Sequence, residues 1–187
     1  MADSEGYDAP MRLEGQLLIA TPTLGEGLFH HSVILLAEHS SDEGAFGLIL
    51  NHPSGHSVGD FLKQDEFEAL SDISVHLGGP VSQENLSFAA LWWSSSEVLR
   101  FETSISAKEA TKRTRIPGVV VRAFLGYSGW SSGQLESEIR NRSWIPAKPT
   151  VELLSCNQDH SLWSETLQNL SLYHRIMAEC PGDPERN

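Results

Sequence analysis

The chain has 187 residues, enough for one domain with a sizeable core, and its 40% hydrophobic and 20% charged residues are typical of a globular protein. Thirteen basic against 25 acidic residues give a formal net charge of −12, which opposes non-specific attraction to nucleic acid or anionic membranes. The acidic start carries no basic segment followed by an apolar one, and no apolar run approaches the roughly 18 residues of a membrane span. We therefore expect a cytoplasmic protein that does not enter a membrane.

The first half of the chain predicts three strands and one helix. Runs of apolar residues predict strands over 15–20, 32–39 and 45–51. The last two are joined by a turn so short that they should be antiparallel. Ser57, with Asp60 three residues on, predicts a helix that begins there and runs to Leu70.

The second half predicts further strands around one long, buried strand. Expected strands cover 75–77, 86–93, 98–103 and 151–155, and a helix is expected over 162–177. Between them, the β-branched and aromatic run 119–125 is typical of a buried strand, and Gly126 and Gly129 predict a sharp turn after it. Ser131 and Gln134 predict a capping box at the start of the next helix, with Trp130 packing on Leu135 as a hydrophobic staple.

The expected turn, Gly126-Tyr127-Ser128-Gly129-Trp130, invites comparison with the nucleophile elbow Gly-x-Ser-x-Gly. Trp130 stands where that motif has its last glycine, and its bulk would obstruct the close approach of strand and helix. We therefore favour a packed aromatic corner over a Ser128 nucleophile.

The histidines do not form a recognisable metal site. His31 and His39 lie eight residues apart on one predicted strand, about 26 Å at roughly 3.3 Å per residue. Glu38 and His39 are neighbours and should point to opposite faces. His52 and His56 are close in sequence but have no identifiable third ligand. We predict neither a metal nor another cofactor.

Two other groups suggest chemistry less strongly than they suggest structure. Cys156 with Asp159 and His160 could form a thiolate–base pair, but catalytic pairs are usually assembled from distant segments, so a structural cysteine is favoured. The basic residues Lys108, Lys112, Arg113 and Arg115 come without a nucleic-acid-binding motif and read as a solvated, helix-poor segment.

Four stretches together resemble the YqgE/AlgH family of bacterial proteins. They are 15–22, 29–53, 77–81 and 125–136, accompanied by Trp144 and Trp163. The resemblance implies an α+β fold: a single domain over 13–178, with a mixed, largely antiparallel sheet flanked by helices. Residues 1–12 and 179–187 are expected to be flexible tails. The family brings no established enzyme activity, although the name AlgH is attached to a proposed regulator of transcription.

Three functional hypotheses follow. The first is a non-catalytic ligand-binding or regulatory protein, with an indirect role in transcription and a small molecule or a protein as its partner. Its site would be built from residues near strand ends and glycine turns: Glu38, His39, Asn51, Gly78, Gly79, Pro80, Tyr127 and Trp130. The alternative is a hydrolase or transferase that uses His39 with Glu38 or a nearby serine. A nucleic-acid-associated regulator would need residues 108–115 to form one continuous positive face, and direct nucleic-acid binding is not expected.

Overall fold

The computed structural model describes residues 12–154 and 161–170. The strands are β1 Leu17–Ala20, β2 Val33–Ser40, β3 Gly44–Ile49, β4 Pro53–Ser57, β5 Ser74–Leu77, β6 Val81–Trp93, β7 Leu99–Ile105, β8 Val119–Trp130 and β9 Trp144–Ala147. The helices are α1 Val58–Phe61, α2 Ala107–Arg113, α3 Gln134–Arg140 and α4 Leu162–Gln168, with 3₁₀ turns η1 Asp65–Leu70 and η2 Val151–Leu154. None of the described helices is long and apolar enough to cross a membrane.

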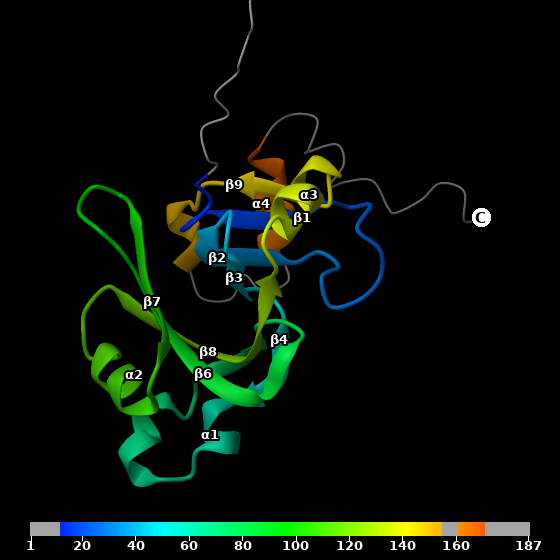
Figure 1. Cartoon of the computed structure of the whole chain (residues 1–187). Coiled ribbons are helices and arrows are strands. Elements are labelled where there is room, and N and C mark those ends of the chain that lie inside the picture. Colours follow the sequence, from blue (N-terminus) through cyan, green and yellow to red (C-terminus); the bar gives the residue numbers. More distant parts are fainter. Residues whose placement is uncertain (1–11, 155–160, 171–187) are drawn as a thin grey trace, which may run out of the picture.

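One mixed sheet contains all nine described strands (Figure 1). Only the pairing of β5 with β8 is parallel, and every other pairing is antiparallel. Strand β8 is central because it pairs with β6 along one edge and with β5 and β3 along the other. The α+β fold with a largely antiparallel sheet is therefore confirmed.

The sheet curls around its main core. Its antiparallel pairings can be followed in the order β7-β6-β8-β3-β2-β1-β9, so β7 and β9 are outermost strands. Residues from both of them, Leu99 and Ala147, nevertheless belong to one hydrophobic cluster, together with Trp163 of α4. In Figure 1 the turn of the β6–β7 hairpin accordingly reaches the level of β9 and β1.

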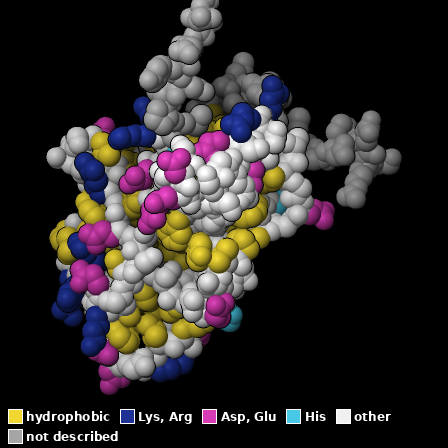
Figure 2. All heavy atoms as spheres, in the orientation of Figure 1, with side chains coloured by type: hydrophobic (Ala, Val, Ile, Leu, Met, Phe, Trp, Pro, Cys, Tyr) yellow, Lys and Arg dark blue, Asp and Glu magenta, His cyan; other side chains and the backbone are white. Residues whose placement is uncertain are grey.

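Helices cover the outer faces of the curled sheet. A second cluster, which includes Trp130, Leu135 and Trp144, lies between the sheet and α3. A third lies beneath α1, η1 and α2 and includes Val58, Leu70 and Ala110. On the face shown in Figure 2, acidic side chains gather above a band of hydrophobic ones, and Lys and Arg side chains line the side where β7 and α2 lie.

The predicted corner after residue 125 is wrong. Strand β8 continues to Trp130. Its residues 128–130 lie beyond the part of β8 that pairs with β5, and they pair with β3 instead. Gly126 has φ +68 and permits an irregularity within the strand, where an added Cβ would lie 2.6 Å from the Val81 carbonyl oxygen. The helix begins at Gln134, preceded by Gly133 with φ +71. Gln134 Oε1 still accepts the Ser131 amide at 3.0 Å, so one half of the predicted capping box forms.

Other differences lie where tertiary packing overrides local pattern. The helix predicted from Ser57 to Leu70 begins as expected, with Asp60 Oδ2 accepting the Ser57 amide at 2.9 Å, but it breaks into α1 and η1. The break lies at Leu62 and Gln64, whose backbones are extended. The strand predicted over 151–155 is the 3₁₀ turn η2 over its described part, where the Leu153 carbonyl accepts Arg122 instead of a neighbouring strand.

Three elements were not predicted. They are β4, β9 and α2. Helix α2 occupies the basic segment expected to be helix-poor, and its start carries a capping signal, since Ser106 Oγ accepts the Glu109 amide at 3.2 Å. Cys156, Asp159 and His160, as well as the end of the predicted 162–177 helix, lie outside the described residues.

Candidate functional site

The eight predicted site residues lie in one part of the sheet but on both of its faces. The register places His39 opposite Ala45 and Ala45 opposite Trp130, so that these side chains share one face. Glu38 is opposite Phe46, on the other face. As a ligand-binding set the eight residues remain a prediction, and their contacts are described next.

His39 and Trp130 belong to the layer that holds α3 on the sheet. The His39 side chain is 3% exposed and its Nε2 lies 3.0 Å from Glu136 Oε1. The indole nitrogens of Trp130 and Trp144 both donate to Glu138 Oε2 at 2.8 Å. The sequence places Glu136 and Glu138 two residues apart, and both meet a donor from the sheet. This geometry gives His39 an anchoring contact to α3, and among the described residues its side chain makes no hydrogen bond to a serine.

Asn51 and the two glycines support the backbone. Buried Asn51 accepts the Val33 amide and donates to the His31 carbonyl, both at 2.8 Å. The Gly78 amide donates to Leu125, and its carbonyl accepts the Ile49 amide at 3.0 Å and Ser128 Oγ at 3.1 Å. A Cβ on Gly79 would lie 2.1 Å from the Tyr127 carbonyl carbon. These glycines therefore let β8 pass closely, and Ser128 is fully buried as a donor to Gly78.

Glu38 and Tyr127 lie beside a shallow acidic hollow. A cavity of about 320 Å³ is lined by Glu14, Glu38, His39, Ser40, Glu43, Gly44, Ala45 and Phe46. The Phe46 and Tyr127 rings are 5.1 Å apart. Pro80 is exposed at the turn that precedes β6. Of the eight predicted residues, Glu38 and His39 are the two that line this cavity.

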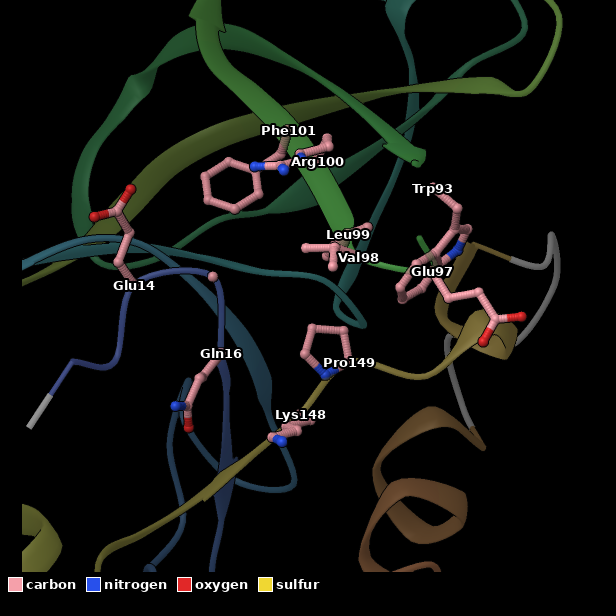
Figure 3. A pocket seen from close by; sticks show the side chains of 11 residues that line it. Glu14, Gln16, Trp93, Glu97, Val98, Leu99, Arg100, Phe101, Lys148 and Pro149 are labelled. Atoms are coloured by element: carbon pink, nitrogen blue, oxygen red, sulfur yellow. The ribbon is translucent and has the colours of Figure 1, made fainter. Parts of the chain in front are cut away.

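A cavity of about 510 Å³ lies elsewhere, between β7 and the segments that flank β1 and β9 (Figure 3). Its lining is Glu14, Gly15, Gln16, Trp93, Glu97, Val98, Leu99, Arg100, Phe101, Lys148 and Pro149. Figure 3 shows Val98 and Leu99 opposite Pro149, with Phe101 and Trp93 toward the two ends and Glu14 and Glu97 beyond them. We call this space the β7–β9 cavity.

Sequence reasoning missed this cavity. The two strands that supply one wall are predicted over 86–93 and 98–103, and Trp92 and Trp93 at the end of the first are the residues that could have drawn attention to this wall. The other wall comes from residues 14–16 and 148–149, far away in the sequence. Their approach to β7 depends on the curl of the whole sheet, which no local pattern reports.

The histidines gather without making a metal site in the described part of the chain, where no group of three or more potential ligands has suitable geometry. His30 and His31 stack at 3.7 Å, and His31 stacks on Trp163 at 3.8 Å. Burial lowers the pKa of His31, and the neighbouring His30 and His52 lower it further. Burial also lowers the pKa of His52.

The basic residues on α2 are partly neutralised by acidic neighbours. Arg113 binds Glu102 and also lies 3.2 Å from Glu109, and Lys112 lies 3.3 Å from Glu109. Two of the four basic side chains of this segment, Lys112 and Arg113, therefore face carboxylates, which interrupts a continuous positive face.

A family model described as AlgH-like matches residues 17–175. The chain belongs to this family. Among its AlgH-like relatives, a UPF0301 protein of Thermobifida fusca is 32% identical, over 98% of this chain and 100% of that protein. A second, from Shewanella woodyi, is 34% identical over 84% of this chain and 91% of its own length.

Two solved structures share the fold. The crystal structure of a Corynebacterium diphtheriae protein has a TM-score of 0.71 at 20% identity, covering 91% of this chain and 93% of that one. The solution structure of the AlgH protein from Pseudomonas aeruginosa has a TM-score of 0.63 at 23% identity, covering 98% and 100%. The AlgH-like family thus accounts for the fold, and its biochemical function is uncharacterised.

Proposed function

We propose that this chain is a non-catalytic binding protein whose ligand occupies the β7–β9 cavity. The observation that carries the proposal is the lining of this 510 Å³ space, which combines two aromatic rings with aliphatic side chains and a charged rim. Ligand sites typically have volumes of about 300–1,000 Å³, mostly apolar walls and a few polar groups that orient the ligand. By comparison, the 320 Å³ hollow near Glu38 is smaller and has three carboxylates in its lining.

The composition of the lining favours binding over catalysis. Its titratable side chains are Glu14, Glu97, Arg100 and Lys148, and it contains no serine, cysteine or histidine. A hydrolase or transferase would need a nucleophile or water held beside a general base. His39, the base of the alternative hypothesis, contacts Glu136, and the hydrogen bonds of the described residues join its side chain to no serine or other nucleophile.

The aromatic and cationic groups suggest what the ligand looks like. Phe101 and Trp93 offer apolar surface, while Arg100 and Lys148 form no ion pair with another described residue. A ligand with an apolar body and a polar or anionic group would satisfy both features. A regulatory role would follow if occupancy of the cavity changed the affinity of the protein for a partner.

Titration with anilinonaphthalene sulfonate, an aromatic probe with one anionic group, tests the proposal. We expect saturable binding at one site and about tenfold weaker binding to Phe101→Ala, roughly 1.4 kcal/mol. Phe46→Ala, which removes an aromatic ring from the lining of the acidic hollow, is the matched control and should bind as the wild type does. Absence of saturable binding, or a loss confined to Phe46→Ala, would refute the proposal.

A further inference from the structure

The open edge of β7 faces the β7–β9 cavity. Among the described strands β7 pairs only with β6, so one of its two edges is free. Residues Val98 to Phe101 line the cavity, together with residues 14–16 and 148–149 on its far side. An open strand edge carries unpaired backbone donors and acceptors that can template another extended segment.

The phase of the β6–β7 ladder identifies which backbone groups are open. The Ser94 amide donates to the Val98 carbonyl at 3.0 Å and closes the hairpin turn. In an antiparallel pair, hydrogen-bonded and non-bonded positions alternate from there. Trp92 therefore exchanges backbone hydrogen bonds with Arg100, and Ala90 exchanges them with Glu102. Leu99 and Phe101 direct their N–H and C=O groups away from β6.

These groups have no hydrogen-bond partner within residues 12–154 and 161–170. Neither the backbone nor the side-chain hydrogen bonds of the described chain involve the main-chain groups of Leu99 or Phe101 on that side. Their side chains point into the main core, where Leu99 is 7% exposed. The edge is thus polar along its backbone and apolar on its inner face.

We propose that an extended peptide segment of a partner protein binds in the β7–β9 cavity as an added strand on β7. Main-chain hydrogen bonds to Leu99 and Phe101 would hold it, and its side chains on the inner face would be apolar where they meet Phe101 and Pro149. This inference rests on the proposed binding function and names the class of ligand.

The fold limits the length of this added strand. The hairpin turn precedes Leu99, and a register shift with Ser104 at φ +56 interrupts the strand beyond Glu102. The regular edge therefore spans about four residues, roughly 13 Å at about 3.3 Å per residue. This register shift also shortens the strand edge that is available for unwanted pairing with other chains.

The cavity favours a single peptide over a second copy of this chain or a nucleic acid. If the β7 of a second copy were added, its own β6 would continue the sheet into the wall formed by residues 14–16 and 148–149. The rim carries Glu14 and Glu97 as well as Arg100 and Lys148. Charges of both signs complement a peptide, whereas a polyanion would meet two carboxylates.

The test is a selection from a random library of pentapeptides with apolar residues at alternate positions, using the full chain as target. We expect peptides that are enriched on the wild type and that lose at least tenfold in affinity on Phe101→Pro. Proline at this position removes an outward N–H without breaking a bond to β6. Phe101→Ala removes the ring but keeps the N–H, so it separates the effect of the ring from that of the donor. Its affinity for the selected peptides should fall less than that of Phe101→Pro. N-methylation of the selected peptide at its bonding amides should abolish binding.

Two outcomes would overturn the inference. One is that no peptide is enriched on the wild type, and the other is that the selected peptides bind Phe101→Pro as tightly as Phe101→Ala. If Phe101→Pro does not fold, slower amide hydrogen exchange of Leu99 and Phe101 in the wild-type complex replaces it, and unchanged exchange refutes the strand. Binding of anilinonaphthalene sulfonate without any peptide enrichment would refute the peptide while leaving the binding function standing. If neither anilinonaphthalene sulfonate nor any peptide binds, both the proposed binding function and the added strand are refuted.

Discussion

Leu99 of β7 and Ala147 of β9 lie in the same hydrophobic core, although each belongs to an outermost strand of the sheet. The two strands are not hydrogen-bonded to each other, and the cavity occupies the space beside them. The curl that brings these residues together therefore produces both the main core and the candidate binding site. This relationship leads to predictions about the packing that maintains the curl and about the cavity itself.

Removal of the Glu138 carboxylate should loosen α3 from the sheet. Its Oε2 accepts both Trp130 Nε1 and Trp144 Nε1, and a buried donor left without an acceptor costs about 1–3 kcal/mol. We expect Glu138→Ala to lower the free energy of unfolding by about 2–4 kcal/mol, as measured by urea denaturation followed by circular dichroism. Glu138→Gln keeps one acceptor oxygen, so its free energy of unfolding should fall less than that of Glu138→Ala. Equal stability of Glu138→Ala and the wild type would contradict this role.

A side chain at Gly79 should disrupt the contact with β8. An added Cβ would lie 2.1 Å from the Tyr127 carbonyl carbon, and both partners in this clash are backbone. We expect Gly79→Ala to lower the free energy of unfolding by about 2 kcal/mol or more, or to prevent folding. Gly25→Ala is the matched control, because nothing lies within 4 Å of its Cβ position, and it should change the stability by less than about 0.5 kcal/mol. Similar stabilities for the two variants would show that the close approach is absent.

His31 should make the stability depend on pH. Its pKa is lowered by burial and by His30 and His52, so the unfolded chain binds the proton more readily than the folded one. The contribution of His31 is therefore fully present above its ordinary pKa of about 6.5 and is lost as the pH falls toward the lowered value. His31→Asn, which tolerates the φ of +53 at this position, should reduce the slope of stability against pH below about 6.5. Thermal unfolding across this range measures the slope, and an unchanged slope would contradict the assignment.

Direct binding to duplex DNA should be absent or weak. The net charge is −12, and two of the basic residues of α2, Lys112 and Arg113, pair with Glu102 and Glu109. A mobility-shift experiment at about 50 mM salt should show no complex at micromolar protein. A complex whose affinity falls steeply between low and physiological salt would instead identify a phosphate-binding face.

The strands and their pairing were accessible from sequence where local signals agree with tertiary packing. The apolar runs of β2 and β3 and the short turn between them predicted an antiparallel pair, and the register confirms it. The resemblance of four stretches to the AlgH-like family gave the fold class, which the structure and its relatives confirm.

Local signals were misleading where a distant segment decides the conformation. Gly126 and Gly129 resemble a turn, yet β3 supplies new hydrogen bonds at residues 128–130 and β8 continues. Glu38 and His39 are neighbours in sequence and both line the acidic hollow, but the strand places their side chains on different faces, and His39 contacts Glu136 of α3. The β7–β9 cavity needs residues 14–16, 97–101 and 148–149 to meet, and no single stretch of sequence contains this information.

The most direct test of the proposed binding site is to map the probe by NMR. Amide shifts of the ¹⁵N-labelled chain would be recorded during titration with anilinonaphthalene sulfonate, and their positions located on the structure. We predict saturable shifts at residues 14–16, 97–101 and Lys148. Residues 38–46, most of which line the acidic hollow, should change little; Glu14 lines both cavities and does not distinguish them. Shifts centred on residues 38–46, or no saturable shifts at the β7–β9 cavity, would contradict the proposal.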